Sequence, residues 1–194
     1  MKKQNKIKTS LIIIILSSIV LLSGCTTQSN NNSTINEPSN NGENFSFALP
    51  DGSTAELKDY RGKIVILDMW ATWCSPCQYQ MLELKKAYET YSQEDLEILS
   101  INVDSRETLS DIEDFIELFS ENGYDLNWVF GNEIDDTDKY KKQPDSGIPS
   151  ICFFDRNGHV VYKHEGVMLF SELPDGWTGE KTLLKDKIDD LINK

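Results

Sequence analysis

Basic side chains are scarce in this sequence of 194 residues, in which 19 lysines and arginines stand against 32 aspartates and glutamates. Phosphate backbones are bound by cationic side chains, so the formal net charge of −13 argues against a nucleic-acid-binding protein. Histidines are scarcer still, and we expect both of them, His159 and His164, to be exposed and to bind no metal. A second Cys-x-x-Cys pair is lacking, which argues against a zinc site of four thiolates.

The four cysteines that are present do not form one set. Cys74 and Cys77 form a Cys-x-x-Cys pair, whereas Cys25 follows a long apolar run near the start of the chain. Cys152 lies inside the apolar stretch 151–154, where a lone cysteine is predicted to be a small buried core residue. Each cysteine therefore needs its own explanation.

The first residues have the pattern of an exported protein. Four lysines and no acidic residue precede an apolar run of twelve residues at 11–22, and small residues follow it. This pattern predicts a secretory signal peptide over residues 1–24. An uncleaved membrane anchor is the alternative, but twelve helical residues span only about 18 Å of a hydrocarbon core about 30 Å thick. Cleavage would remove the four lysines and change the formal net charge from −13 to −17.

The segment Leu22-Ser23-Gly24-Cys25 resembles the lipobox of prokaryotic lipoproteins. The resemblance implies cleavage before Cys25 and a diacylglycerol on its sulfur. Residues 25–44 are rich in Asn, Ser and Thr, and they are predicted to be a flexible tether because they cannot bury enough apolar surface to fold. We therefore expect a domain over residues 45–194 that lies outside the cytoplasm and is lipid-anchored to the cell membrane.

Residues 45–194 alternate between strand and helix patterns. Short alternating segments on either side of Pro50-Asp51-Gly52 predict a β-hairpin. Near-continuous apolar runs predict strands that are buried on both faces, and spacing of three to four residues predicts amphipathic helices. The expected strands are 63–69, 96–103, a short one at 127–130, and a hairpin of 150–154 with 159–163; the expected helices are 76–91, 107–122 and 182–193. This order predicts an α/β fold, with a mixed central sheet flanked by helices and an N-terminal β-hairpin extension.

The Cys-x-x-Cys pair stands between an expected strand and an expected helix. Cys74 would then lie at the helix N-terminus, where free N–H groups and the helix dipole stabilise a thiolate. Cys77, one turn later, could attack a mixed disulfide formed on Cys74, and Pro76 suits a first helical turn. A structural disulfide or part of a metal site could use the same spacing, so the strand and helix around the pair are what favour redox catalysis.

The segment Asp68-Met-Trp-Ala-Thr-Trp-Cys-Ser-Pro-Cys77 resembles the active site of thioredoxins, and most closely that of the extracytoplasmic TlpA/ResA-like thioredoxins. Three further segments carry the likeness, and it runs from about Phe45 to Lys194. They are the hairpin Phe45–Gly52, with the pattern Phe-x-Phe-x-Leu-Pro-Asp-Gly, then Tyr60-Arg-Gly-Lys63, and Gly147–Gly158, which begins Gly-Ile-Pro-Ser. The likeness implies a thioredoxin fold and a thiol–disulfide oxidoreductase with no cofactor beyond its redox-active disulfide. It also implies a cis proline at Pro149 and substrate contacts at Trp73, Ile148 and Pro149, unless Gly147–Ser150 is an ordinary turn.

Asp68 is unusual even without the resemblance, because a carboxylate in an apolar strand is costly unless it has a purpose. By resemblance it is the acid that exchanges a proton with Cys77, and burial would raise its pKa toward the working pH. A carboxylate at the strand end facing solvent is the alternative. Gln80 stands where many relatives have a glutamate, and Leu82 where they commonly have a proline, so any proton relay must rest on Asp68.

Three functions remain open at this point. The first is a tethered reductant of disulfides in exported proteins, an apocytochrome c among them, which would take electrons from a membrane thiol donor and act as a monomer. The second is a peroxiredoxin-like peroxide reductase, although the proline expected before Thr72 is missing. The third is a non-catalytic lipoprotein that binds a partner. The irregular stretch 169–180, with Trp177, is expected to be a packed surface loop rather than a cover over the site.

Overall fold

The computed structural model describes residues 42–178 and 180–194. The signal peptide predicted over 1–24, the lipidation predicted at Cys25 and most of the tether predicted over 25–44 lie outside these ranges. None of the helices in the described ranges is long and apolar enough to cross a membrane.

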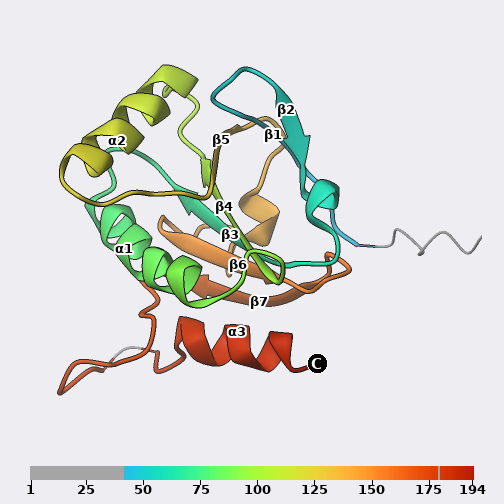
Figure 1. Ribbon diagram of the computed structural model, residues 1–194, viewed down its shortest axis with the longest axis vertical. Coiled ribbons are helices and arrows are strands. Elements are labelled where there is room, and N and C mark those ends of the chain that lie inside the picture. Colours follow the sequence, from blue (N-terminus) through green and yellow to red (C-terminus); the bar gives the residue numbers. More distant parts are fainter. Residues whose placement is uncertain (1–41, 179) are drawn as a thin grey trace, which may run out of the picture. The chain divides into compact units, whose positions relative to one another are not determined.

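Within the described ranges, seven strands form one mixed sheet in the order β2-β1-β5-β4-β3-β6-β7 (Figure 1). The strands are β1 (Ser46–Ala48), β2 (Thr54–Glu56), β3 (Ile64–Trp70), β4 (Leu96–Asn102), β5 (Val129–Glu133), β6 (Ser150–Phe154) and β7 (Val160–Glu165). The central strands β3, β4 and β5 run parallel, and β1, β2, β6 and β7 are joined to the sheet by antiparallel pairings. This is the thioredoxin-type mixed sheet with the predicted N-terminal hairpin at one edge.

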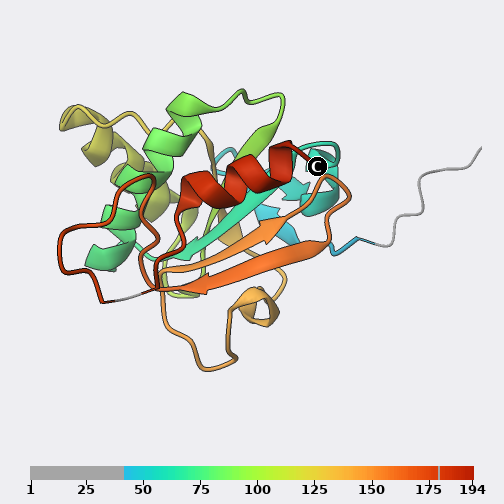
Figure 2. The same ribbon diagram turned by 90° about the horizontal axis from the view of Figure 1, so that it is seen from below.

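The helices α1 (Ser75–Thr90), α2 (Leu109–Glu121) and α3 (Leu184–Ile192) share one face of the sheet. The helices α1 and α2 lie on the same face because each connects two parallel strands by a right-handed crossover, and β3, β4 and β5 follow one another in the same direction across the sheet. A single core cluster joins all three helices to alternate residues of β3: Ile64, Ile66, Trp70, Met81, Ile112 and Ile188 belong to it. In Figure 2 the three helices lie above β6 and β7, and the 3-10 turn η2 (Asp138–Tyr140) lies below them.

The opposite face of the sheet is covered by short turns and the N-terminal hairpin instead of helices. Val65, Leu67 and Met69 of β3 point to this side and pack with aromatic residues far away in the chain. These include Phe45, Phe47 and Tyr140, whose rings lie within 6 Å of a neighbouring ring. Full burial of such aromatic side chains stabilises the fold by about 1.5–3 kcal/mol each.

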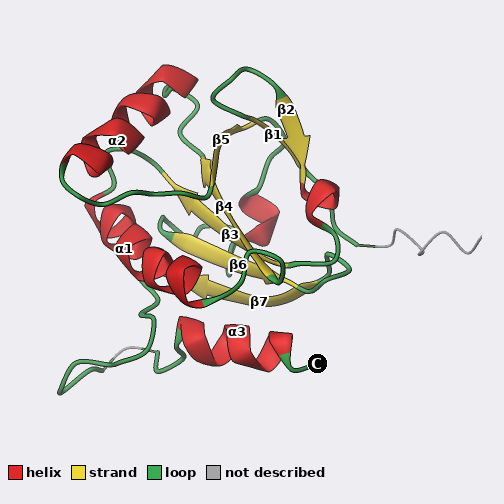
Figure 3. Ribbon diagram, viewed as in Figure 1, coloured by secondary structure: helices red, strands yellow, loops and turns green. Residues whose placement is uncertain are grey.

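The predicted elements are present with small shifts at their ends. The third helix begins at Leu184 rather than at 182, and β5 extends to Glu133 rather than ending at 130. Residues 43 and 44, assigned to the tether, are bonded to the domain: the Glu43 N–H donates to the Gly158 carbonyl at 2.9 Å, and Asn44 accepts from the Lys58 N–H at 2.9 Å. The described residues of the connection from β7 to α3 form neither helix nor strand (Figure 3).

Candidate active site

The Cys-x-x-Cys pair lies where β3 ends and α1 begins. Cys74 is the N-cap residue of α1, and its sulfur accepts a hydrogen bond from the Cys77 N–H at 3.3 Å. The two cysteines are joined by a disulfide, with their Cα atoms 5.2 Å apart. Cys74 is 3% exposed and Cys77 is fully buried, so Cys74 is the one that solvent reaches. Free N–H groups at a helix N-terminus stabilise an anion, and this position therefore favours a Cys74 thiolate in the reduced protein.

Trp73, predicted to contact substrate, stands beside the disulfide with 60% of its surface exposed. Its indole N–H donates to Asp104 Oδ2 at 2.7 Å, which fixes the ring on the surface. Hydrogen bonds from Arg106, and then the one from Trp73, hold the pKa of Asp104 well below its usual range. The exposed ring is thus held in place by a carboxylate that stays ionised.

A second carboxylate holds the loop before the cysteines. Glu107 accepts hydrogen bonds from the Thr72 N–H at 3.0 Å, from the Thr72 hydroxyl and from the Asn102 side chain at 2.5 Å. Sequence reasoning missed both Asp104 and Glu107. A signal was available, because both follow β4, and the carboxyl ends of neighbouring parallel strands meet at the same edge of a sheet.

Asp68 is completely buried, not at a solvent-facing strand end. It sits between Ile66 and Trp70 on the side of β3 that the helices cover, the side on which Cys77 is packed. The Ser100 hydroxyl donates to Asp68 Oδ2 at 2.9 Å, and the Trp128 indole N–H donates to Ser100 at 3.0 Å. Among the described residues, Asp68 Oδ1 has no hydrogen-bond partner. Burial raises the pKa of Asp68 to about 7, and the Ser100 hydrogen bond lowers it in part. A carboxyl with this pKa can take up and release a proton near neutral pH.

The Ile148–Pro149 peptide bond is cis, as the resemblance implies. Ser150 pairs with Met69 in the antiparallel β3–β6 register, which places Pro149 opposite Trp70, at the end of β3 that leads into the redox loop. Pro149 is buried, and its carbonyl accepts a hydrogen bond from the Gly166 N–H at 3.0 Å. Ile148 is half-buried and packs against both core clusters. Both residues therefore lie at the same edge of the sheet as the disulfide, on the β6 side of it.

Gln80 is buried on α1 and holds the chain after β7 instead of facing the disulfide as an acid. Its Nε2 donates to the Met168 carbonyl at 3.1 Å, and its Oε1 accepts from the Met168 N–H at 2.6 Å. One turn later, Glu83 accepts from the Phe170 N–H at 2.8 Å. A glutamine supplies both a donor and an acceptor, which a carboxylate cannot. The amide at this position thus fastens residues 168–170 to the helix that carries the cysteines.

The Gln80→Glu variant should be as stable as the wild type near pH 4 and less stable by about 2–4 kcal/mol at pH 8. A protonated glutamate still donates to the Met168 carbonyl, but an ionised one leaves that carbonyl facing a buried negative charge. Burial raises the folded pKa of such a glutamate, so stability falls as pH rises from its unfolded value through the folded one. Urea unfolding at pH 4 and pH 8 measures the effect. Gln93→Glu, the same change at an exposed position, is the control, and a loss of equal size there would contradict the prediction.

Cys152 and the histidines lie outside this arrangement. Cys152 is buried in the core cluster on the face away from the helices, and burial raises the pKa of its thiol to about 12, so it is the predicted core residue.

His159 is exposed, but the prediction that His164 is exposed was wrong: it is 4% exposed, and its ring lies 3.3 Å from the Val167 carbonyl. In residues 42–178 and 180–194, no three His, Cys, Asp or Glu side chains converge as a metal site. Trp177 bonds within its own loop, donating to the Glu180 carbonyl at 2.9 Å.

Comparison with known proteins gives one family. Residues 40–163 match the AhpC/TSA family. The chain is 34% identical over 124 residues to the thiol-disulfide oxidoreductase ResA of Geobacillus kaustophilus, a match that covers 63% of this chain and 67% of that protein. It is 30% identical over 136 residues to ResA of Bacillus thuringiensis subsp. konkukian, covering 68% of this chain and 72% of the relative.

Solved structures show the same fold. An exposed lipoprotein thioredoxin from Streptococcus pneumoniae superposes with a TM-score of 0.52 at 24% identity, covering 77% of this chain and all of the other. A thiol-disulfide isomerase from Corynebacterium glutamicum superposes with a TM-score of 0.59 at 16% identity, covering 79% of this chain and 98% of the other. At these identities the likeness shows the fold alone.

Proposed function

The chain belongs to the AhpC/TSA family as a TlpA/ResA-like thiol–disulfide oxidoreductase of the thioredoxin fold, and on this premise we propose that it is a membrane-tethered reductant of disulfides in exported proteins. The observation that carries the proposal is the Cys74–Cys77 disulfide at the N-terminus of α1, with Asp68 buried on the same side of β3. Such a pair cycles between dithiol and disulfide without a further cofactor, and its substrates are thiols and disulfides of other proteins.

The proposed reaction uses two disulfide exchanges. The Cys74 thiolate attacks one sulfur of the substrate disulfide, forms a mixed disulfide with it, and releases the other sulfur as a thiolate. Cys77 gives its proton to the Asp68 carboxylate, directly or through water, and its thiolate attacks the Cys74 sulfur. The substrate leaves reduced, as a dithiol, and the enzyme is left oxidised, with Cys74 and Cys77 joined in a disulfide. A membrane thiol donor then returns two electrons to the pair.

The tether and location are proposed from the sequence. Residues 1–24 have the features of a signal peptide, and Cys25 stands at the lipidated position of a lipobox, so the domain would be anchored by lipid outside the cytoplasm. The pneumococcal protein of the same fold is named an exposed lipoprotein, which is consistent with such a location. We further propose that the protein acts as a monomer and that an apocytochrome c is one candidate substrate.

Reductant and oxidant differ in the reduction potential of the Cys74/Cys77 pair, and this potential tests the proposal. It is measured by equilibrating the purified Cys25→Ser protein against glutathione or dithiothreitol buffers. We expect a value near or below about −250 mV, close to that of thioredoxin, which makes the protein a reductant. A value near about −120 mV would make it a disulfide donor and reverse the proposed direction. A peroxide-consumption assay separates the peroxiredoxin-like alternative, for which we expect no activity above that of Cys74→Ser.

A further inference from the structure

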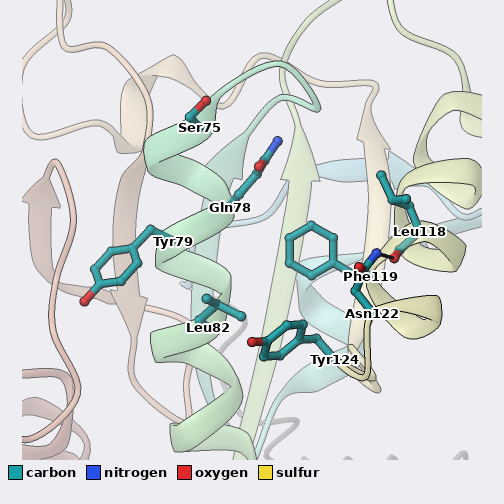
Figure 4. A pocket seen from close by; sticks show the side chains of 8 residues that line it. All are labelled: Ser75, Gln78, Tyr79, Leu82, Leu118, Phe119, Asn122 and Tyr124. Carbon is teal, nitrogen blue, oxygen red and sulfur yellow. Dashed lines mark hydrogen bonds between the residues drawn. The ribbon is translucent and has the colours of Figure 1, made fainter.

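A groove open to solvent runs between α1 and α2 and starts beside the disulfide. Its main hollow has a volume of about 440 Å³ and is lined by Ser75, Gln78, Tyr79, Leu82, Leu118, Phe119, Asn122 and Tyr124. In Figure 4 Leu82 on α1 and Phe119 on α2 lie on opposite sides of the hollow, with Tyr124 at its lower end in this view. Gln78 points toward the upper end, where its Nε2 donates to the Thr72 carbonyl at 2.9 Å. Ser75, one of the residues that line this hollow, follows Cys74 directly in the chain.

Two further hollows extend the main one along α1. One shares Gln78, Leu118 and Phe119 with it and reaches Thr72 in the redox loop. The other shares Tyr79, Leu82 and Tyr124 and reaches Glu89 near the end of the helix. From Ser75 to Glu89 an α-helix rises about 21 Å, which is the length of about six residues of extended peptide. The groove is therefore long enough for a polypeptide segment and wide enough in its middle for one large side chain.

The surface of the groove is unusually apolar for an exposed position. Tyr79, Leu118 and Tyr124 are 49%, 54% and 46% exposed. Tyrosine and leucine side chains exposed together next to a reactive centre indicate a contact surface, because a tyrosine offers apolar area and a hydroxyl at low cost in side-chain entropy. Among the described residues, the hydroxyls of Tyr79 and Tyr124 have no hydrogen-bond partner, so both are available to the peptide groups of a bound chain.

The charge at the end of the groove next to Thr72 is negative. The helix α2 carries five acidic residues and no lysine or arginine, and two of its acids, Asp111 and Asp114, line the hollow next to Thr72. Lys85 and Lys86 line the hollow at the other end of the groove, where they are paired with Glu89 and Glu83. A basic side chain placed beside the apolar hollow would therefore be attracted, and an acidic one repelled.

We propose that this groove binds the part of the substrate polypeptide next to its cysteine, with an aromatic or branched apolar side chain between Leu82, Phe119 and Tyr124 and a lysine or arginine beside Asp111 and Asp114. The proposal rests on the proposed function and names the class of substrate that the enzyme prefers. Pro149 lies on the β6 side of β3, and the groove lies on the β4 and β5 side. Substrate residues on both sides of the attacked cysteine would thus be recognised.

The test measures how fast Cys74 attacks four matched peptides. The full-length Cys25→Ser, Cys77→Ser protein leaves Cys74 as the reactive thiol, with Cys152 buried. Each peptide carries one cysteine joined to thionitrobenzoate, and three to five residues away it carries Phe-Lys, Phe-Glu, Ala-Lys or Ala-Glu. Cys74 forms a disulfide with the peptide sulfur, and the coloured thionitrobenzoate anion leaves with the electrons of the broken bond. We expect Phe-Lys to react at least about 10-fold faster than Ala-Glu at low salt, with a smaller ratio at high salt.

Two variants assign the preference to the groove. Tyr124→Ala should remove most of the advantage of Phe over Ala, whereas Val161→Ala, an exposed apolar position on β7, should keep it. Asp114→Lys should reverse the advantage of Lys over Glu, whereas the same charge change at Asp190 on α3 should not. Equal rates for all four peptides, or preferences that survive both groove variants, would overturn the proposal while leaving the redox function intact. A wild-type dimer that Tyr124→Ala dissociates, with the peptide ratios unchanged, would assign the groove to a second copy and overturn it as well.

Discussion

Cys74→Ser should lower the rate of insulin disulfide reduction by at least about 1,000-fold, because this sulfur is the one that solvent reaches and is the nucleophile of the proposed reaction. Cys77→Ser should also stop turnover, but by a different route: the first exchange proceeds, and the mixed disulfide on Cys74 accumulates because nothing resolves it. Turbidity of precipitating insulin measures the first effect, and intact mass of the trapped complex measures the second.

The matched control is Cys152→Ala, which removes the buried thiol on the other face of the sheet. Its rate should stay within about twofold of the wild type, since a thiol with a pKa of about 12 supplies almost no thiolate at neutral pH. If Cys74→Ser kept a tenth of the wild-type rate, or if Cys152→Ala lost its activity while remaining folded, the assignment of the redox pair would fail.

Asp68→Asn should slow the resolution of the mixed disulfide by about 100-fold at pH 8, because an amide cannot accept the Cys77 proton. In the wild type the rate of this step should rise with pH and level off above the Asp68 pKa of about 7, and the variant should lack that inflection. Stopped-flow measurement of resolution from pH 5 to pH 9 gives both results. Ser100→Ala is the informative second variant: it removes the hydrogen bond that lowers the Asp68 pKa, so the inflection should move to higher pH. An unchanged inflection in Asp68→Asn would assign the titration to another group.

The same variant should make the oxidised protein more stable at high pH. The folded pKa of Asp68, about 7, lies above the unfolded value of about 3.9, so between these values the unfolded chain binds fewer protons and stability falls as pH rises. The full penalty above pH 7 is about 4 kcal/mol, and Asp68→Asn should recover about 2–4 kcal/mol of it at pH 8 and little at pH 4. Urea unfolding at the two pH values measures this. A variant that is less stable than the wild type at pH 8 would show that the buried carboxylate is not costly.

Local patterns in the sequence were sufficient for the α/β class and the order of the elements, and the thioredoxin fold followed from the resemblance of the active-site segment. The apolar runs of β3 and β4 and the spacing of apolar residues in α2 are patterns among residues that are close in the chain. Such patterns can be recognised in the sequence without knowledge of the tertiary structure. His164 shows where this fails: a histidine in an edge strand is exposed by its local pattern, but the chain at Val167 returns over it. The burial of a side chain by a later loop is decided by tertiary packing, which single-sequence patterns do not contain.

The redox pair and Asp68 could be placed from the sequence because the strand–loop–helix context is local. Glu107 and Gln80 could not. Glu107 acts on Thr72 from 35 residues away, and Gln80 bonds Met168 from 88 residues away. In the sequence, Gln80 drew attention only because it cannot carry a proton as the glutamate of many relatives can. In the structure Gln80 needs its amide, because the side chain both donates to and accepts from the backbone of Met168. This pairing depends on the folded chain and has no signal in the local sequence.

The placement of the N-terminal hairpin in the sheet has a consequence for how the protein folds. The hairpin pairs with β5, and the Ser46 N–H donates to Asp135, 89 residues further along the chain. During synthesis the two hairpin strands appear early and can pair with each other, but β5, the strand that joins them to the rest of the sheet, follows much later. Closing so long a loop is entropically costly and makes folding slow. The aromatic residues Phe45 and Phe47 therefore remain exposed until the chain as far as β5 has been made, and during this interval the chain is most susceptible to proteases and to aggregation.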